Sequence, residues 1–255
     1  MKYLVVILVA CLQVVSGFAE QQTNTLSKAE RLRMSTGGFV FDRRKADGQV
    51  VFVNAQKRVS KDVLAAHVER LERECMMTMK VEDSEPFVLQ DAAGKIKAVN
   101  ANLAVFILDS DLPVSMMLAP DQKYAVVNVK ELAKDSPSSE KLEMRVKKQM
   151  VRAVALLFGT GYAVAGDGTV MPVNGLEGLD ELPLMILPVS VTSTMLKFAS
   201  EKFGIRPFRR TFYVYALKEG WAPPPKGKYQ KMLWEQYNAK PTQPMRIKFD
   251  PKQGK

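Results

Sequence analysis

The chain has 255 residues, 47% of them hydrophobic, and a formal net charge of +10 at pH 7. A chain of this length can bury one sizeable core and is near the upper limit for a single domain, so we expect one main domain with terminal extensions. It contains one histidine and two cysteines. One histidine is too few for a zinc site with three histidine ligands.

The first 19 residues have the pattern of a secretory signal. Lys2 is followed by the apolar run 4–15 and then by small residues up to Ala19, which predicts export and cleavage after Ala19. The run is too short for a stable membrane span. Residues 8–11 also have the form of a lipoprotein box, so lipid attachment at Cys11 and a retained anchor are alternatives. Each route exports the protein.

The mature chain remains basic. Cleavage removes one lysine, which leaves 36 basic and 27 acidic residues and a net charge of +9. Such a protein is expected to meet anionic envelope surfaces or acidic polymers, although a solvated basic surface is the simpler explanation. The basic residues form no stripe with interleaved aromatic residues, which disfavours nucleic acid as a partner. Cys75 is then the only thiol, which excludes an intramolecular disulfide.

The order of elements begins with a strand, a helix and a second strand. Residues 20–46 read as a polar arm with a short strand at 39–41. A strand at 49–54 precedes a helix that Ser60 can cap, and residues 77–81 are again β-prone, so part of the sheet is parallel. The apolar positions of the helix recur at steps of 4, 3 and 4: Leu64, Val68, Leu71 and Cys75. Its neighbour His67 is expected at the boundary of the core, making one hydrogen bond.

Two further strand regions follow. We expect a hairpin within residues 84–102, turned by residues 91–94. Its two strands would be residues 87–90 and 96–99. The unbroken apolar run 103–108 predicts a strand that is covered on both faces of the sheet.

Two carboxylates stand at the end of that strand. Asp109 and Asp111 are candidate ligand contacts, as an acid/base pair or a cation site, but the turn before Pro113 also favours these residue types, and we prefer the turn. Short strands are expected at 115–118 and 124–129.

The longest predicted helix starts at Ser138 or Ser139. Its apolar positions continue at steps of 4, 4, 4 and 3: Leu142, Val146, Met150, Val154 and Leu157. The first half of the helix is amphipathic and expected to be solvated, with four cations outside the apolar face: Arg145, Lys147, Lys148 and Arg152. Residues 153–158 are apolar all round, so the helix is expected to enter the middle of the domain and to end at Gly159 and Gly161.

This helix and the segment after it resemble the metzincin peptidases, in particular the archaemetzincin-like branch. The active-site helix of that family carries HExxHxxGxxH and is followed by a turn with a buried methionine. Gly159 matches the glycine and Met171 the methionine, and residues 174–182 resemble the acidic segment after the turn. The resemblance covers about residues 49–204. It implies an α/β (α+β) zincin-like core: a mixed twisted sheet, a buried central helix and a C-terminal helix.

The same resemblance implies zinc ligands that this sequence lacks. The first ligand position is Arg152, the general-base position Ala153, the second ligand position Leu156 and the third Tyr162. Arginine and leucine offer no lone pair and alanine no base. We therefore expect no metal, no cofactor and no zinc proteolysis, with Arg152 in the place of the cation, paired with a carboxylate. An ordinary buried helix in an unrelated α/β domain, with Met171 as a core residue, is the alternative.

The C-terminal third begins with an apolar loop, 182–189, interrupted by two prolines. A helix from Thr192 or Ser193 should end at Gly204. The remaining expected elements are a basic segment at 206–210, a strand at 211–216, a short helix at 229–237 and an edge strand at 245–249. Trp221, followed by three prolines, either contacts a ligand or attaches the C-terminal arm to the domain, and we favour attachment.

These features divide the chain into a signal peptide (1–19), an arm (20–46), a core (47–205) and a C-terminal extension packing on the core (206–255). We expect an exported, catalytically inactive component of the cell envelope that binds a peptide, an envelope polymer or another envelope protein. A lipid-anchored partner protein is one alternative. The other is a hydrolase with a carboxylate pair drawn from Asp109, Asp111, Asp167, Glu177 and Asp180.

Overall fold

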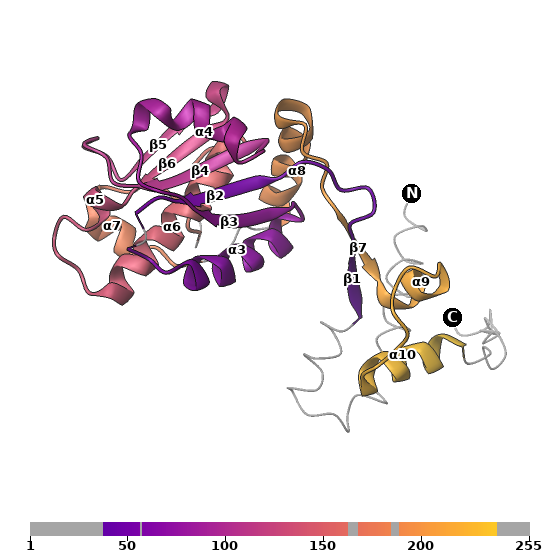
Figure 1. Cartoon of the computed structure of the whole chain (residues 1–255). Coiled ribbons are helices and arrows are strands. Elements are labelled where there is room, and N and C mark those ends of the chain that lie inside the picture. Colours follow the sequence, from indigo (N-terminus) through magenta and orange to yellow (C-terminus); the bar gives the residue numbers. More distant parts are fainter. Residues whose placement is uncertain (1–37, 57, 163–167, 185–188, 239–255) are drawn as a thin grey trace, which may run out of the picture. The chain divides into compact units, whose positions relative to one another are not determined.

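The computed structural model describes residues 38–56, 58–162, 168–184 and 189–238 (Figure 1). They belong to two compact units. The larger unit is residues 42–209, and the smaller combines the segment that ends at Phe41 with the segment that starts at Arg210. The signal region, Cys11, Asp167 and the strand expected at 245–249 lie outside the described residues. No helix in the described part of the chain has the length and apolar character needed to cross a membrane.

A five-stranded mixed sheet forms the centre of the larger unit, in the order β3-β2-β4-β6-β5 (Figure 1). Its strands are β2 (Val50–Asn54), β3 (Met79–Asp83), β4 (Leu103–Leu108), β5 (Met116–Ala119) and β6 (Tyr124–Asn128). β2 is parallel to β3 and β4, and β4 is parallel to β6, whereas β5 pairs antiparallel with β6. The mixed α/β fold predicted from the sequence is confirmed.

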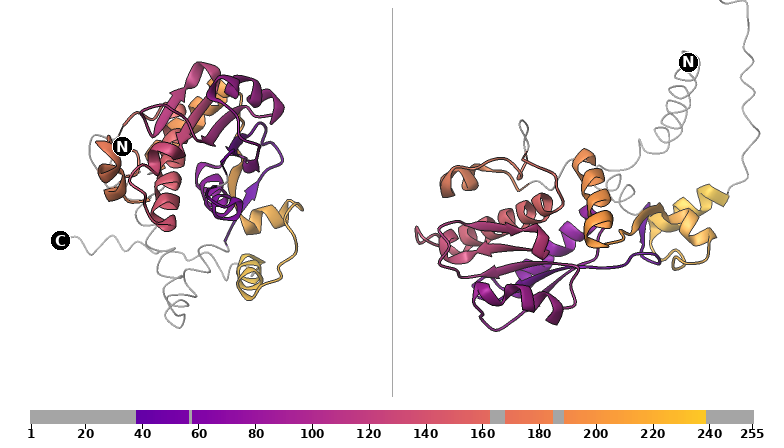
Figure 2. Two further views of the ribbon diagram at one scale, coloured as in Figure 1. Left: turned by 60° about the vertical axis from the view of Figure 1, so that its left-hand side comes forward. Right: turned by 90° about the horizontal axis from the view of Figure 1, so that it is seen from above.

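The central strands are apolar on both faces because helices cover both faces. Alternate residues of β2, such as Val50 and Phe52, pack with helices α3 (Lys61–Cys75), α6 (Ser139–Leu157) and α8 (Val189–Phe203). The intervening residues, such as Val51, pack with α4 (Ala92–Ala98) on the opposite face. Seen from above, α4 and α6 lie on opposite sides of the sheet (Figure 2).

Helix α3 has the predicted cap and the predicted buried stripe. The Ser60 hydroxyl accepts a hydrogen bond from the backbone N–H of Val63. Cys75 is fully buried, and burial raises the pKa of its thiol to about 12, which leaves it an unreactive core residue. His67 is only 6% exposed, and its Nε2 has no hydrogen-bond partner in the described structure. Burial, together with the charge of Lys147, lowers the pKa of His67 to about 4.

The hairpin expected at 87–99 is wrong. A 3₁₀ turn, η1 (Leu89–Asp91), runs directly into helix α4. The reason is packing: Ala92 and Ile96, four residues apart, lie on one side of a helix and bury themselves against the far face of β2, β4 and β6. A hairpin would leave that face of the sheet uncovered.

The long helix α6 begins and ends where the sequence predicts. The Ser138 hydroxyl accepts from the backbone N–H of Lys141. At the other end the N–H of Gly159 donates to Leu156 and that of Thr160 donates to Ala155, so the last carbonyls have partners. Gly159 has φ +71°, and a Cβ there would lie 3.1 Å from the Phe198 ring. Both facts favour glycine at this position.

Short helices α5 (Val129–Leu132) and α7 (Gly175–Glu181) flank α6 in the sequence. α8 begins at Val189, three residues before the predicted start, and Gly204 ends it with φ +65°. The N–H of Ile205 donates to the carbonyl of Ala199. Ile205 is fully buried, so the chain after α8 folds back on the core as the glycine predicts.

The smaller unit contains most of the two-stranded sheet of β1 (Phe39–Asp42) and β7 (Arg209–Phe212), followed by α9 (Tyr213–Lys218) and α10 (Lys228–Asn238). The predicted strand at 211–216 is therefore wrong after Phe212. Tyr213 and Ala216, three residues apart, form a small buried cluster that needs a helical turn, and the Tyr213 hydroxyl donates to the carbonyl of Pro223 at 2.7 Å. Trp221 packs against this same cluster.

Candidate functional site

One face of α6 is polar and buried. Arg145, Lys148, Gln149 and Arg152 follow one another at steps of 3, 1 and 3, which places them on one side of the helix. Their exposed fractions are 1%, 4%, 2% and 2%. The expectation that the first half of the helix is solvated is wrong for Arg145 and Lys148, because residues 168–182, which include α7, cover this side of the helix. The buried cations must therefore find partners within the protein.

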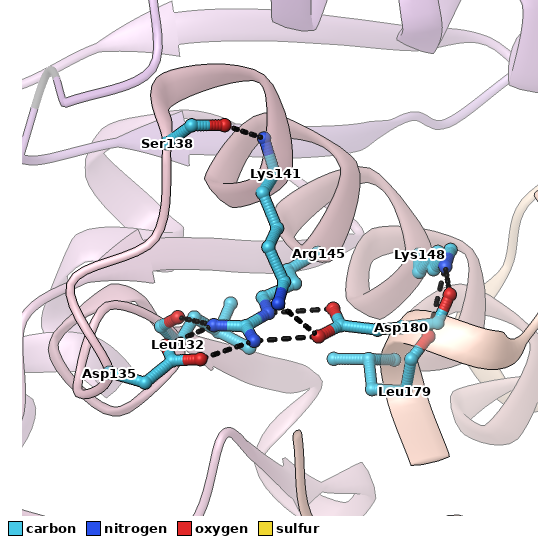
Figure 3. Close-up of polar contacts among 8 residues, drawn as sticks. All are labelled: Leu132, Asp135, Ser138, Lys141, Arg145, Lys148, Leu179 and Asp180. Carbon is cyan, nitrogen blue, oxygen red and sulfur yellow. Dashed lines mark hydrogen bonds and ion pairs between the residues drawn. The ribbon is translucent and has the colours of Figure 1, made fainter. Parts of the chain in front are cut away.

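Arg145 lies at the centre of a cluster of polar contacts (Figure 3). Its guanidinium donates two hydrogen bonds to the Asp180 carboxylate, both at 2.7 Å, and two to Asp135 at 2.5 and 2.8 Å. A fifth bond reaches the carbonyl of Leu132 at 2.7 Å. Arg145 lowers the pKa of Asp135 to about 2 and also lowers the pKa of Asp180. Arg145 thus binds α7 and the loop after α5 to α6.

Lys148 extends this cluster by one turn of the helix. Its ammonium donates to the carbonyls of Leu179 and Asp180, at 2.9 and 2.7 Å (Figure 3). Burial lowers the pKa of Lys148. The carbonyls belong to the last turn of α7, where unpaired carbonyls favour a cation.

Arg152 is bound differently. Its Nε donates to the side-chain oxygen of Gln149 at 3.0 Å, and its Nη1 donates to the carbonyls of Thr169, at 3.0 Å, and Met171. The Tyr162 ring lies beside it, with its centroid 5.5 Å from the guanidinium carbon. Burial lowers the pKa of Arg152. The carboxylate partner expected for Arg152 is not found among the described residues.

Arg152 lies at a cleft of about 500 Å³. The cleft is lined by Pro113, Val114, Ser115, Met116, Glu131, Gln149, Arg152, Tyr162, Pro172, Val173, Gly175 and Leu176. Its walls are residues 113–116, which lead into β5, on one side and the segment between Met171 and α7 on the other. Gln149 joins the helix to the strand side, since its Nε2 donates to the Ser115 hydroxyl at 2.8 Å. The volume is within the range of ordinary ligand sites.

Asn128 shapes the rim of the cleft, although it was not among the residues predicted for the site. This residue ends β6 and is 1% exposed. Its Oδ1 accepts from the N–H of Ser110, and its Nδ2 donates to the carbonyls of Ser110, Leu112 and Val114 at 2.9–3.2 Å. These bonds hold the loop that carries Pro113 and Val114 into the cleft. An asparagine at the end of an otherwise apolar strand is the one sequence signal that could have indicated it.

The other positions of the predicted motif are not at the cleft. Ala153 is fully buried in the core, Leu156 is half-buried and Gly159 ends the helix. Met171 is only half-buried, unlike the methionine that the resemblance implies, and it contributes its backbone carbonyl to Arg152. Of the predicted set, the structure brings Arg152 and Tyr162 together at the cleft, with the Met171 carbonyl next to them.

Three of the candidate carboxylates form ion pairs: Asp109, Asp111 and Asp180. Asp109 pairs with Arg58 at 2.8 Å, and Asp111 with Lys130 at 2.6 Å. Lys130 lowers the pKa of Asp111, while a general acid needs a raised pKa. Neither residue is among those that line the cleft, and the same holds for Glu177 and Asp180. The carboxylate-pair alternative gains no support from the described residues.

Two solved structures are similar to this chain. One is a zinc-dependent peptidase from Methanocorpusculum labreanum (strain Z), with 15% sequence identity, a TM-score of 0.47 and coverage of 58% of this chain and 100% of the peptidase chain. The other is archaemetzincin from Methanopyrus kandleri, with 15% identity, a TM-score of 0.46 and coverage of 60% and 96%. No family model matches the chain, and no curated protein matches it either.

The zinc that the resemblance implies does not fit the residues present. Arg152 offers only N–H donors, Leu156 offers no ligand atom, and the phenol of Tyr162 alone is not a site. In the described ranges no group of three or more histidine, cysteine, aspartate or glutamate side chains is placed to hold a metal ion. The chemistry of the cleft must therefore be explained from its own donors and acceptors.

Proposed function

We propose that this chain is an exported peptide-binding protein without peptidase activity that acts as a binding or structural component of the cell envelope. The observation that supports this most directly is the position of Arg152. It fills the first ligand position of the motif, it is almost fully buried, and it joins α6 to the turn at 169–171 while an open cleft remains beside it.

The groups that line the cleft are suited to binding rather than to catalysis. Hydrolysis of a peptide bond needs a base or a nucleophile activated by one. The Ser115 hydroxyl accepts a hydrogen bond from Gln149, an amide that cannot take up its proton. Glu131, the one carboxylate among the cleft residues of the described chain, pairs with Lys134 at 3.2 Å.

An extended peptide suits the cleft because Met116, the first residue of β5, lines it, and β5 is the edge strand of the described sheet. The N–H of Asn128 donates to the carbonyl of Ser115, so the main chain of Ser115 faces β6. Because main-chain groups alternate in an antiparallel ladder, those of Met116 face the cleft side. A peptide strand can pair with such an edge while its side chains use the apolar lining.

Two substitutions at Met116 test this proposal. M116P removes the outward N–H without removing a bond to β6, and M116V removes the same side chain but keeps the N–H. Retention of a degenerate hexapeptide pool on the immobilised mature chain is the measurement. We expect M116V to retain the pool and M116P to lose it. Equal retention by the two variants, with both folded by circular dichroism, contradicts pairing along β5.

Two measurements on the wild-type chain test the remaining parts. Metal analysis of untagged protein, together with a casein hydrolysis assay, should give neither stoichiometric zinc nor cleavage; finding both together overturns the absence of peptidase activity. Mass spectrometry of the N-terminus of protein recovered from cells should find Glu20 as the first residue. Lipid on Cys11 would instead favour the lipid-anchored alternative.

A further inference from the structure

Among the described residues, Arg152 is a buried cation with no buried carboxylate as a counter-charge. The hydrogen bonds of its Nε and Nη1 go to uncharged acceptors: the Gln149 amide oxygen and the carbonyls of Thr169 and Met171. In the part of the chain that the structure describes, no carboxylate forms an ion pair with it. A buried charge in this condition is unfavourable unless an anion approaches it. Arg145 avoids the problem because Asp135 and Asp180 neutralise it.

The three bonds also fix the orientation of the guanidinium. They use Nε and Nη1, and Nη2 takes part in none of them. The guanidinium is therefore held in place by the protein before any ligand arrives, which reduces the entropy lost on binding. A planar carboxylate is the natural partner for such a pre-placed group.

The charge and polarity of the other cleft residues restrict which ligands can bind at Arg152. Its other described residues include one acid, Glu131, already paired with Lys134, and several apolar side chains such as Met116 and Leu176. A doubly charged phosphate would need a second free cation, and the described lining contains none besides Arg152. A single carboxylate next to apolar side chains matches both the charge and the lining.

We infer that the cleft selects peptides that place a carboxylate on Arg152. This inference rests on the proposed function, because it assigns the charge of a ligand that lies along β5. The carboxylate comes from the C-terminus of the peptide or from an acidic side chain. Both sources offer the same chemistry to the guanidinium, so the experiment must separate them.

Three degenerate hexapeptide pools without other acidic residues make this separation on the immobilised mature chain. The first has a free C-terminus, the second is amidated, and the third is amidated with one fixed glutamate. The wild-type chain should retain the first or the third pool about tenfold or more over the second, since a hydrogen bond to a charged group contributes this much. Whichever of the two is preferred identifies the source of the carboxylate.

Variants at Arg152 test whether this residue causes the preference for a carboxylate. R152Q should lose the preference for the carboxylate pool over the amidated pool, and R152K, which keeps the charge, should retain part of the preference. The M116P variant should retain none of the three pools. The comparison of pools on the wild-type chain needs no variant and therefore does not depend on whether R152Q folds.

Three outcomes overturn the inference. Equal retention of all three pools by the wild type contradicts a carboxylate contact with Arg152 but is compatible with peptide binding. Retention of no pool removes the proposed function as well. A preference that appears only in D167N shows that the chain's own acid, which lies outside the described residues five positions after Tyr162, already serves as the counter-charge.

Discussion

A buried arginine lies at each end of the polar face of α6, and the two arginines have different kinds of partner. Arg145 is enclosed by two carboxylates and a carbonyl, whereas Arg152, two turns further along, has an amide oxygen and two carbonyls and borders an open cleft. A neutralised buried cation acts as a structural link between segments. A buried cation without a counter-charge at a cleft is suited to receive a ligand. The difference predicts that the two arginines respond differently to substitution.

The largest effect should come from Arg145. R145M leaves Asp135 and Asp180 facing each other across the lost guanidinium, and breaking a buried pair in this way costs about 3–5 kcal/mol, nearer the lower figure here because Asp135 is half exposed. Urea unfolding followed by circular dichroism measures it, since urea does not screen charge. K141M, which removes only the exposed partner of Asp180, should change the free energy of unfolding by less than about 1 kcal/mol. Similar losses in both variants would mean that Arg145 is not the link.

The pH dependence of stability should distinguish the two ends. Asp135 and Asp180 have lowered pKa values in the folded chain, so the stability from their pairing is present above about pH 4 and is lost as pH falls through their folded pKa values, which for Asp135 is about 2. R145M should lose this slope. R152Q should keep it, because Arg152 pairs with carbonyls that do not titrate. The measurement is the urea midpoint of the wild type and of both variants between pH 5 and pH 2. If R145M shows the same pH dependence as the wild type, Arg145 is not the partner that lowers these pKa values.

His67 adds a separate titration at higher pH. The pKa of His67 is lowered from 6.5 to about 4 in the folded chain. Between these two pH values the unfolded chain binds a proton at His67 and the folded chain does not. The free energy of unfolding therefore falls as pH decreases from about 6.5 to about 4. The shift corresponds to about 3 kcal/mol at most. H67L should flatten the profile in this window only. A profile that is already flat in the wild type would contradict the buried neutral imidazole.

Substitution of Arg152 should destabilise the fold less than substitution of Arg145. R152M removes the arginine donor to the carbonyls of Thr169 and Met171, a loss of about 1–3 kcal/mol, but it also removes a buried charge that has no carboxylate partner among the described residues. We therefore expect a small decrease in the urea midpoint together with loss of the preference for carboxylate peptides. A decrease as large as that of R145M, with peptide preference intact, would make Arg152 a structural link like Arg145.

Much of the fold could be predicted because the signals are local. The strand–helix–strand unit follows from the spacing of Leu64, Val68 and Leu71, and the end of α6 follows from Gly159. The apolar run of β4 indicates burial on both faces, and the structure confirms it. In each case the residues that decide the structure are within one or two turns of one another.

The errors have a common cause, which is a partner distant in the sequence. Arg145 looks solvated along α6 until Asp180, 35 residues later, covers it. Ile96 has a strand-like neighbourhood, but it becomes helical because the far face of the sheet needs a cover. Asn128 determines the cleft rim through residues 14 to 18 positions earlier. No window of local sequence contains these contacts.

The smallest effect in this comparison should come from Tyr162, which is 49% exposed and lies over the Arg152 guanidinium. Y162L removes the ring and with it a cation–π contact worth about 0.5–1 kcal/mol at an exposed site, whereas Y162F keeps the ring and serves as the matched control. Urea midpoints should fall slightly for Y162L and remain unchanged for Y162F. With Arg152 less tightly held, Y162L should also weaken the preference for carboxylate peptides a few-fold. If Y162F weakens that preference as much as Y162L does, the phenol hydroxyl rather than the ring positions the carboxylate, and the cleft recognises its ligand through two donors instead of one.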